Sequence, residues 1–60
     1  MAEKILIIDD DAETLRLIGI MLQRQEYQTV TASNGDDGVA LAKTELPDFI
    51  ILAIMMTEVK

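Results

Sequence analysis

The sequence contains no cysteine and no histidine, and these absences remove the two commonest supports of very small domains. Without cysteine no disulfide can form, and without either residue the usual zinc ligands are missing. A domain of 60 residues buries only about 60% of the surface that its unfolded chain exposes. We therefore expect marginal stability for the isolated chain, and we expect association with another chain to supplement it.

Basic residues are also scarce. Five lysines and arginines stand against eleven carboxylates, and the formal net charge is −6. Nucleic acids are held mainly by lysine and arginine on phosphates, so we expect no nucleic-acid binding. The longest apolar runs, residues 5–8 and 49–56, are far too short to span a membrane, and residues 1–8 carry no secretory signal pattern. The sequence thus predicts no membrane association and a cytoplasmic location.

Apolar residues form strand-like runs and helix-like stripes along the chain. Residues 4–8 form a short β-branched run, which is typical of a strand covered on both faces. A second run takes its β-branching from Thr29, Val30 and Thr31, and its polar content suits the edge of a sheet. In chain order the predicted elements are a strand over residues 4–8, a helix whose stripe is Leu15, Ile18, Gly19 and Leu22, a strand over residues 26–32, a helix over residues 36–45 and a strand over residues 48–55.

This β-α-β-α-β order predicts a single α/β domain over residues 1–60 without a linker. Strands joined by helical connections run parallel through right-handed crossovers. We expect Gly38 to weaken the second helix and Pro47 to stop it. On the first helix, Leu17 and Met21 widen the apolar arc to about half the circumference, which is more than one contact surface needs.

Three consecutive carboxylates, Asp9, Asp10 and Asp11, follow the first predicted strand. Open parallel sheets place ligands at the carboxyl ends of their strands, and a cation or a metal-bound phosphate would relieve the repulsion among three carboxylates. The alternative is that Asp10 or Asp11 caps the following helix, with Glu13 completing a capping box behind Asp10. Both interpretations hold together if Asp11 caps while Asp9 and Asp10 face the site.

Three segments carry a family resemblance: ILIIDDD at the first strand, TASNGDDGVALA at the second helix and LPDFIILAIMM at the third strand. Together with the amphipathic helix that follows the first of them, they closely resemble the amino-terminal half of the receiver domain of bacterial two-component response regulators. The acidic cluster, the Asn-Gly before the second helix and the Pro-Asp before the third strand are independent features in the right order and spacing. The resemblance runs through nearly the whole chain.

The resemblance implies a five-stranded flavodoxin-like fold, in which the three strands present here have the order 2-1-3. In that family a histidine kinase supplies a phosphoryl group to an aspartate that ends strand three, and Mg²⁺ is held beside it. By position, Asp10 corresponds to the direct Mg²⁺ ligand, Asp9 to the ligand that acts through water, and the main-chain carbonyl of Met55 to the third protein ligand. Oxygen ligands of this kind suit Mg²⁺.

Three departures from the family pattern change the expected function. Ala53 occupies the acceptor position, and a methyl group cannot attack phosphorus, so we expect no phosphorylation there. Thr57 replaces the usual proline in the following loop. We also expect strands four and five to be missing, together with the hydroxyl residue and the lysine that sense the phosphoryl group. The sequence thus predicts no enzyme activity, no cofactor, and at most weak, vestigial Mg²⁺ binding.

Strand three is the centre of the complete family sheet, but here it is expected at an edge. A long hydrophobic edge is a template for another strand. We expect a homodimer about a two-fold axis, in which the two third strands pair antiparallel, with cross-β aggregation as the competing outcome. The predicted interface residues are Phe49, Ile50, Ile51, Leu52 and Ile54 on the strand, with Leu17 and Met21 on the first helix.

Two functional hypotheses follow from these patterns. The first is a phosphorylation-silent receiver half-domain that acts as an association module in phosphorelay signalling. The second is a fragment or engineered variant of a Mg²⁺-dependent phosphoacceptor receiver that needs its carboxy-terminal half, although Ala53 argues against its chemistry. Besides a second copy, the partners expected are that complementary half or a histidine kinase.

Overall fold

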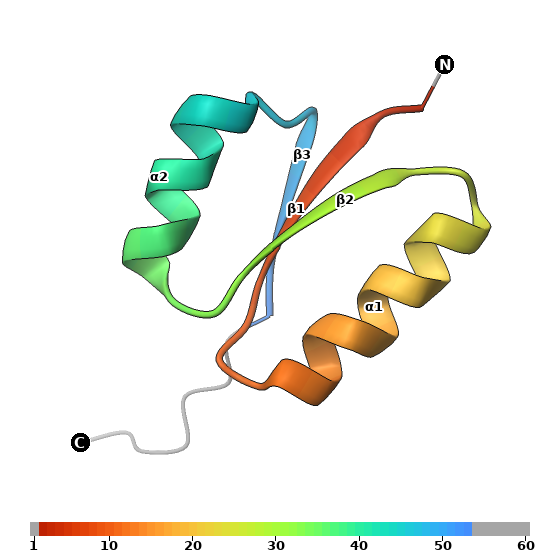
Figure 1. Ribbon diagram of the computed structural model, residues 1–60, viewed down its shortest axis with the longest axis horizontal. Helices are drawn as coiled ribbons and strands as arrows, with labels where there is room; N and C mark the ends of the chain where they lie inside the picture. Colours follow the sequence, from red (N-terminus) through yellow and green to blue (C-terminus); the bar gives the residue numbers. More distant parts are fainter. Residues whose placement is uncertain (1, 54–60) are drawn as a thin grey trace.

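Figure 1 shows the computed structural model, which describes residues 2–53. In chain order its elements are β1 (Lys4–Ile8), α1 (Ala12–Arg24), β2 (Gln28–Ala32), α2 (Gly35–Glu45) and β3 (Phe49–Leu52). Both strand pairs are parallel, and the sheet has the order β2-β1-β3. The predicted α/β class, element order and sheet order are therefore confirmed.

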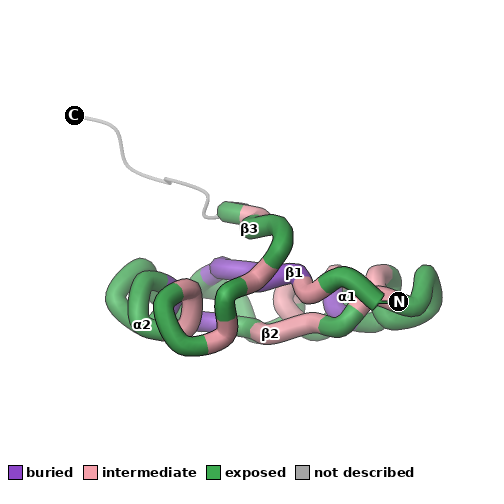
Figure 2. The backbone as a smooth tube through the Cα atoms, turned by 90° about the horizontal axis from the view of Figure 1, so that it is seen from above, coloured by how far each residue is buried: buried purple, intermediate pink, exposed green. Residues whose placement is uncertain are grey.

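The core is built on the central strand, β1. Its residues Ile5 to Ile8 are all buried, and Figure 2 shows buried positions along β1 between the two helices. Leu6, Ile8 and Ala32 form the cluster beneath α2, whereas Thr29 on the other face accepts a hydrogen bond from Gln23 of α1. Because side chains alternate along a strand, α1 and α2 cover opposite faces of the sheet. This double cover explains the continuous apolar run of β1.

Gly38 lies where α2 comes closest to the sheet. It is buried, and a Cβ added there would meet the side chain of Ile8, at 3.0 Å from Cγ1 and closer still to Cδ1. The sequence interpretation treated Gly38 only as a weak point of the helix. In the structure its missing side chain lets the helix backbone pack directly on β1, a contact that no local pattern could reveal.

The end of α1 corrects the predicted start of the second strand. Gln25 is the C-cap, and Glu26 adopts a left-handed conformation with φ 67°. The N–H of Glu26 donates to the carbonyl of Gln23 at 2.9 Å, and the N–H of Tyr27 donates to that of Leu22 at 3.1 Å. This Schellman pattern usually contains glycine at the position of Glu26. The prediction of a strand from residue 26 was wrong because that glycine signal is absent; β2 begins at Gln28.

Two further element boundaries differ from the predicted ones. Asn34 caps α2, since its Oδ1 accepts from the N–H of Asp37 at 2.8 Å, and the helix therefore begins at Gly35 instead of residue 36. At the other end of the chain, β3 covers Phe49–Leu52, so that Asp48 precedes it and Ala53 follows it. The strand was predicted to reach Met55, which lies outside the described residues.

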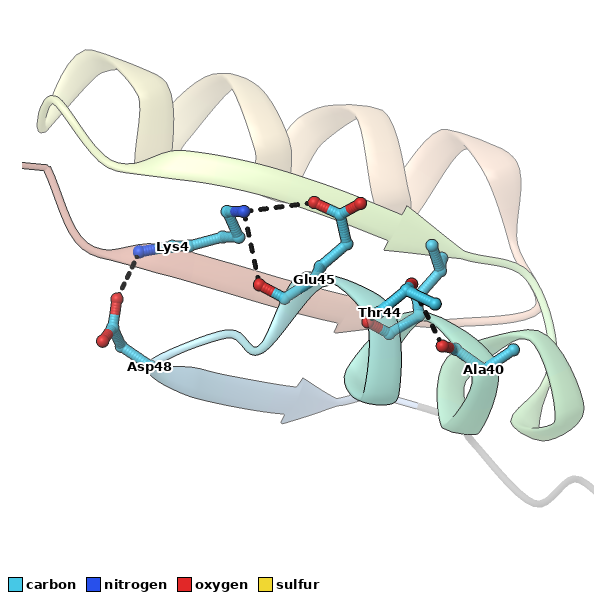
Figure 3. A network of polar contacts seen from close by, with 6 residues as sticks. Lys4, Ala40, Thr44, Glu45 and Asp48 are labelled. Carbon is cyan, nitrogen blue, oxygen red and sulfur yellow. Dashed lines mark hydrogen bonds and ion pairs between the residues drawn. The ribbon is translucent and has the colours of Figure 1, made fainter.

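A polar network fastens the start of β1 to the connection between α2 and β3 (Figure 3). The Lys4 ammonium contacts Glu45 at 3.1 Å and also donates to the main-chain carbonyl of that residue. The main-chain N–H of Lys4 donates to the Asp48 carboxylate at 2.7 Å, and the N–H of Asp48 donates back to the Lys4 carbonyl. The ion pair is partly exposed and is worth ~0–1 kcal/mol. The main-chain bonds place the entry to β3 beside the start of β1.

The outer side of α1 keeps the excess apolar surface that its pattern predicts. Leu17 and Met21 are 60% and 65% exposed, and Ile20 is exposed as well. The helix has 13 residues, and neither helix within residues 2–53 is long and apolar enough to cross a membrane.

Candidate functional site

The carboxyl ends of β1 and β3 bring Asp9 and Ala53 together. Asp9 follows Ile8 and is buried, at 4% exposed. Its main-chain N–H donates to the carbonyl of Ala32, and its Oδ1 accepts from the N–H of Asp11 at 2.9 Å. Ile8 is paired with Leu52, and the N–H of Ala53 donates to the Ile8 carbonyl at 2.9 Å. The acidic residue and the predicted acceptor position therefore end neighbouring strands.

Asp11, and not Asp10, is the N-cap of α1. Its Oδ1 accepts from the N–H of Glu13 at 3.0 Å, and its Oδ2 accepts from the Thr14 hydroxyl at 3.2 Å. The predicted capping box of Asp10 and Glu13 was therefore wrong, because the N-cap residue is Asp11, one position later. Asp10 is exposed and is not the cap, and like Asp9 it lies in the connection between β1 and α1.

Ala53 places a methyl group where the family resemblance implies the phosphoryl acceptor. Its side chain is half-buried at the carboxyl end of the sheet, next to the strand that leads to Asp9. An alanine side chain has no lone pair with which to attack phosphorus and no oxygen with which to bind a metal. Alanine at this position therefore supplies neither a nucleophile nor a metal ligand.

The donor set around Asp9 and Asp10 fits Mg²⁺ only in part. Carboxylate oxygens are the correct ligand type, but one oxygen of Asp9 is already bonded to the N–H of Asp11. Within residues 2–53, no group of three or more carboxylate, histidine or cysteine side chains is arranged to hold a metal ion. Met55, whose carbonyl was the third predicted ligand, lies outside the described residues. We assign no chemical step to a metal on this donor set.

The second candidate site is the β3 surface, which we define as residues 49–52. Phe49, Ile50 and Leu52 are 56%, 55% and 68% exposed, and Ile51 is half-buried. Figure 2 shows β3 at the margin of the molecule with exposed residues along it, and β1 is its strand partner in the sheet of the described residues. β3 is thus an apolar outer strand of the sheet that residues 2–53 form, whereas Ile54 lies outside the described residues.

Leu17 and Met21 lie on the flank of α1 that faces away from β2. Gln23 bonds to Thr29 of β2, and a Cβ at Gly19 would have Thr29 as its nearest neighbour, so this flank turns toward the β2 edge. At 100° per residue, Leu17 and Met21 project from the opposite flank. They therefore point away from the β2 edge of the sheet.

Sequence reasoning missed two further exposed apolar residues, which belong to α2 and to its C-cap. Val39 on α2 and Leu46 at its C-cap are 56% and 78% exposed. No pattern in the sequence distinguishes them from the half-buried Leu41 and Ala42, because only the position of α2 against β1 decides which flank is covered. Exposed apolar side chains thus occur on α1 and on α2 as well as on β3.

The sequence of the chain is similar to those of known proteins. The family model of the response regulator receiver domain matches residues 5–60. The chain is 39% identical over 56 residues to the alkaline phosphatase synthesis transcriptional regulatory protein PhoP of Bacillus subtilis, covering 93% of this chain and 23% of that protein. It is 42% identical over 53 residues to protein PilH of Pseudomonas aeruginosa, covering 88% of this chain and 44% of that protein.

A third relative is a longer protein of which the chain matches only a small part. Response regulator PleD of Caulobacter vibrioides is 38% identical over 56 residues, which cover 93% of this chain and 12% of that protein. The chain thus spans less than half the length of each of these relatives. The match to the family model extends over almost all of the sequence, and the parallel β2-β1-β3 sheet is the corresponding part of a flavodoxin-like fold. The chain therefore belongs to the family of response regulator receiver domains.

Proposed function

We propose that the chain is a phosphorylation-silent receiver segment of two-component signalling, and that it acts as a protein association module through the β3 surface. The observation that carries this proposal is the state of β3. Within the sheet that residues 2–53 form, it is a four-residue edge strand without a charged side chain, and three of its four residues are largely exposed. Soluble proteins normally protect such an edge with charge, proline or a covering element. An uncovered apolar edge favours a partner strand.

The proposed silence follows from Ala53. We expect no mass increase when the chain is incubated with acetyl phosphate and Mg²⁺ and analysed by intact mass spectrometry, because the methyl group of residue 53 cannot attack phosphorus. The matched control is Ala53→Asp, which places a carboxylate at the same position. A phosphorylated adduct of about 80 Da on the unmodified chain would disprove silence and would direct the search to another acceptor.

The proposed partner is a second copy of the chain. We expect light scattering behind a sizing column to give twice the 6.7 kDa mass of one chain over a wide concentration range, with folded circular dichroism spectra on the same samples. A folded monomer at every concentration would contradict association. A mixture of large species would instead indicate runaway strand pairing through the same edge.

The Asp9 and Asp10 pair is proposed to bind Mg²⁺ weakly, with no role in a reaction. Two carboxylates, one of them held by a main-chain N–H, compete poorly with the water shell of Mg²⁺. In an NMR titration we expect the amide signals of Asp9 to Asp11 to shift only at millimolar Mg²⁺. Saturation below about 1 mM, the limit that separates weak sites from tight ones, would contradict the proposal. Asp10→Asn should reduce the shifts, whereas Asp36→Asn on α2 should not.

A second candidate function rests on the exposed apolar side chains outside β3. A complementary carboxy-terminal receiver half would cover side chains that are exposed here, such as Leu17, Met21, Val39 and Leu46. A histidine kinase is a further candidate partner, and the cytoplasm is the proposed location. A chain that is unfolded alone, but folds when mixed with a separately expressed carboxy-terminal receiver segment, would favour this alternative over self-association.

A further inference from the structure

We propose that Asn34 and Gly35 form a deamidation site, at which the main chain attacks the Asn34 side chain and releases ammonia when the first turn of α2 opens. Asn34 is the only asparagine in the sequence, it directly precedes Gly35, and both residues are exposed to solvent. Water is the only co-reactant. The inference concerns the connection between β2 and α2 and does not depend on association through β3.

The reaction needs only the atoms of these two residues and water. The main-chain nitrogen of Gly35 attacks Cγ of Asn34, so a bond between these atoms forms while the bond from Cγ to Nδ2 breaks. The Nδ2 group takes up the proton of the attacking nitrogen and leaves as ammonia. Water then opens the resulting cyclic imide. Attack at Cγ gives aspartate, whereas attack at the main-chain carbonyl carbon gives isoaspartate, and no group is oxidised or reduced.

Gly35 leaves its own nitrogen accessible. It has no Cβ to shield the nitrogen, and a Cβ built there would meet nothing within 4 Å. Gly35 is also the first residue of α2, and the first N–H groups of a helix have no intrahelical acceptor. Glycine tolerates the backbone rotations that ring closure requires. The restraint on the reaction must therefore come from Asn34 and its partners.

Asp37 holds both polar atoms of the Asn34 side chain in the folded chain. Oδ1 of Asn34 accepts from the main-chain N–H of Asp37 at 2.8 Å, and Nδ2 donates to the Asp37 carboxylate at 3.1 Å. The backbone of Asn34 is extended, with φ −157° and ψ 171°. Ring closure requires the Gly35 nitrogen to rotate toward Cβ of Asn34. That rotation would break these bonds and the one from the N–H of Gly38 to the Asn34 carbonyl at 3.0 Å.

Either product weakens the start of α2. An aspartate at residue 34 replaces the amide nitrogen by a carboxylate oxygen that faces the Asp37 carboxylate, so repulsion takes the place of a hydrogen bond. An isoaspartate adds a methylene group to the main chain and displaces the capping oxygen. Leu41 and Ala42 of α2 pack on the core cluster of the sheet. Modification at residue 34 therefore makes a transient opening of the helix permanent and lowers the stability of the fold.

Incubation of the chain in mildly alkaline buffer, with and without urea, tests the site. Intact mass spectrometry and isoaspartate-specific methyl labelling follow the conversion, and circular dichroism checks the fold. We expect conversion to be at least about tenfold faster in urea, because the native cap has to open first. Asn34→Ser keeps a capping oxygen without an amide and should give no isoaspartate. No conversion of the unmodified chain in urea would overturn the site, and equal rates in both buffers would overturn its restraint by the fold.

A second comparison, in native buffer, tests the role of Asp37. We expect Asp37→Ala to convert about threefold faster or more, because the bond to Nδ2 of Asn34 is lost. Asp36→Ala removes the same charge from the same helical turn and should leave the rate nearly unchanged. Equal rates for these two variants would overturn the restraint by Asp37. Ile7→Val loosens the buried core of β1 and should accelerate conversion less than Asp37→Ala does. The opposite order would overturn local opening in favour of global unfolding.

Discussion

Replacing Ile51 with lysine should convert the associated chain into a monomer and raise the dissociation constant by about 100-fold or more, or ~2.7 kcal/mol. Ile51 is half-buried in the middle of β3 and is paired with Ile7 of the core strand. A lysine at this position puts an ammonium group in the middle of the apolar β3 surface of each copy. Like charges that face each other across an interface cost several kcal/mol. Sedimentation equilibrium or light scattering at several concentrations measures the change.

The matched control for this prediction is Gln28→Lys on the β2 edge. It changes the net charge of the chain by the same amount at an exposed strand residue, but it lies outside the proposed interface. We expect the control to remain associated, and circular dichroism should confirm that both variants are folded. If Ile51→Lys remains as strongly associated as the control, β3 is not the contact surface. The exposed Leu17 and Met21 of α1 would then become the next interface to test.

Replacing Gly38 with alanine should destabilise the fold by about 1–2 kcal/mol, although alanine is the better helix former. The added Cβ would overlap the side chain of Ile8, which is only 8% exposed and has little room to move. Overpacking of a core costs ~1–3 kcal/mol, whereas the gain in helix propensity is ~1 kcal/mol. For a domain of marginal stability, this loss is a large fraction of the total. The midpoint of urea unfolding, followed by circular dichroism, measures it.

Gly35→Ala provides the internal comparison, because it makes the same chemical change in the same helix. A Cβ at Gly35 meets nothing within 4 Å, and the residue has no left-handed backbone. We expect this variant to keep or slightly increase stability through its higher helix propensity. If both variants stabilise the fold equally, the contact between α2 and β1 is looser than its geometry implies. Comparison at equal protein concentration keeps the effect of association constant.

The sequence determined the arrangement of strands and helices because its signals are local and periodic. The continuous apolar run of Ile5 to Ile8 specifies a strand that needs cover on both faces, and that strand is the centre of the sheet. The polar content of the second strand likewise predicted an edge, and β2 is an outer strand of the sheet. The identity of residue 53 is also a property of the sequence alone, and it removes the acceptor chemistry at that position whatever the packing.

Only the tertiary structure decided features that depend on contacts between distant residues. Gly38 is a packing residue because Ile8, thirty positions earlier, lies against it, and Leu46 and Val39 are exposed because α2 covers the sheet with its other flank. Glu26 ends α1 in a left-handed turn that usually signals itself by glycine. Local propensity cannot encode these choices, since each is set by the burial of one element against another.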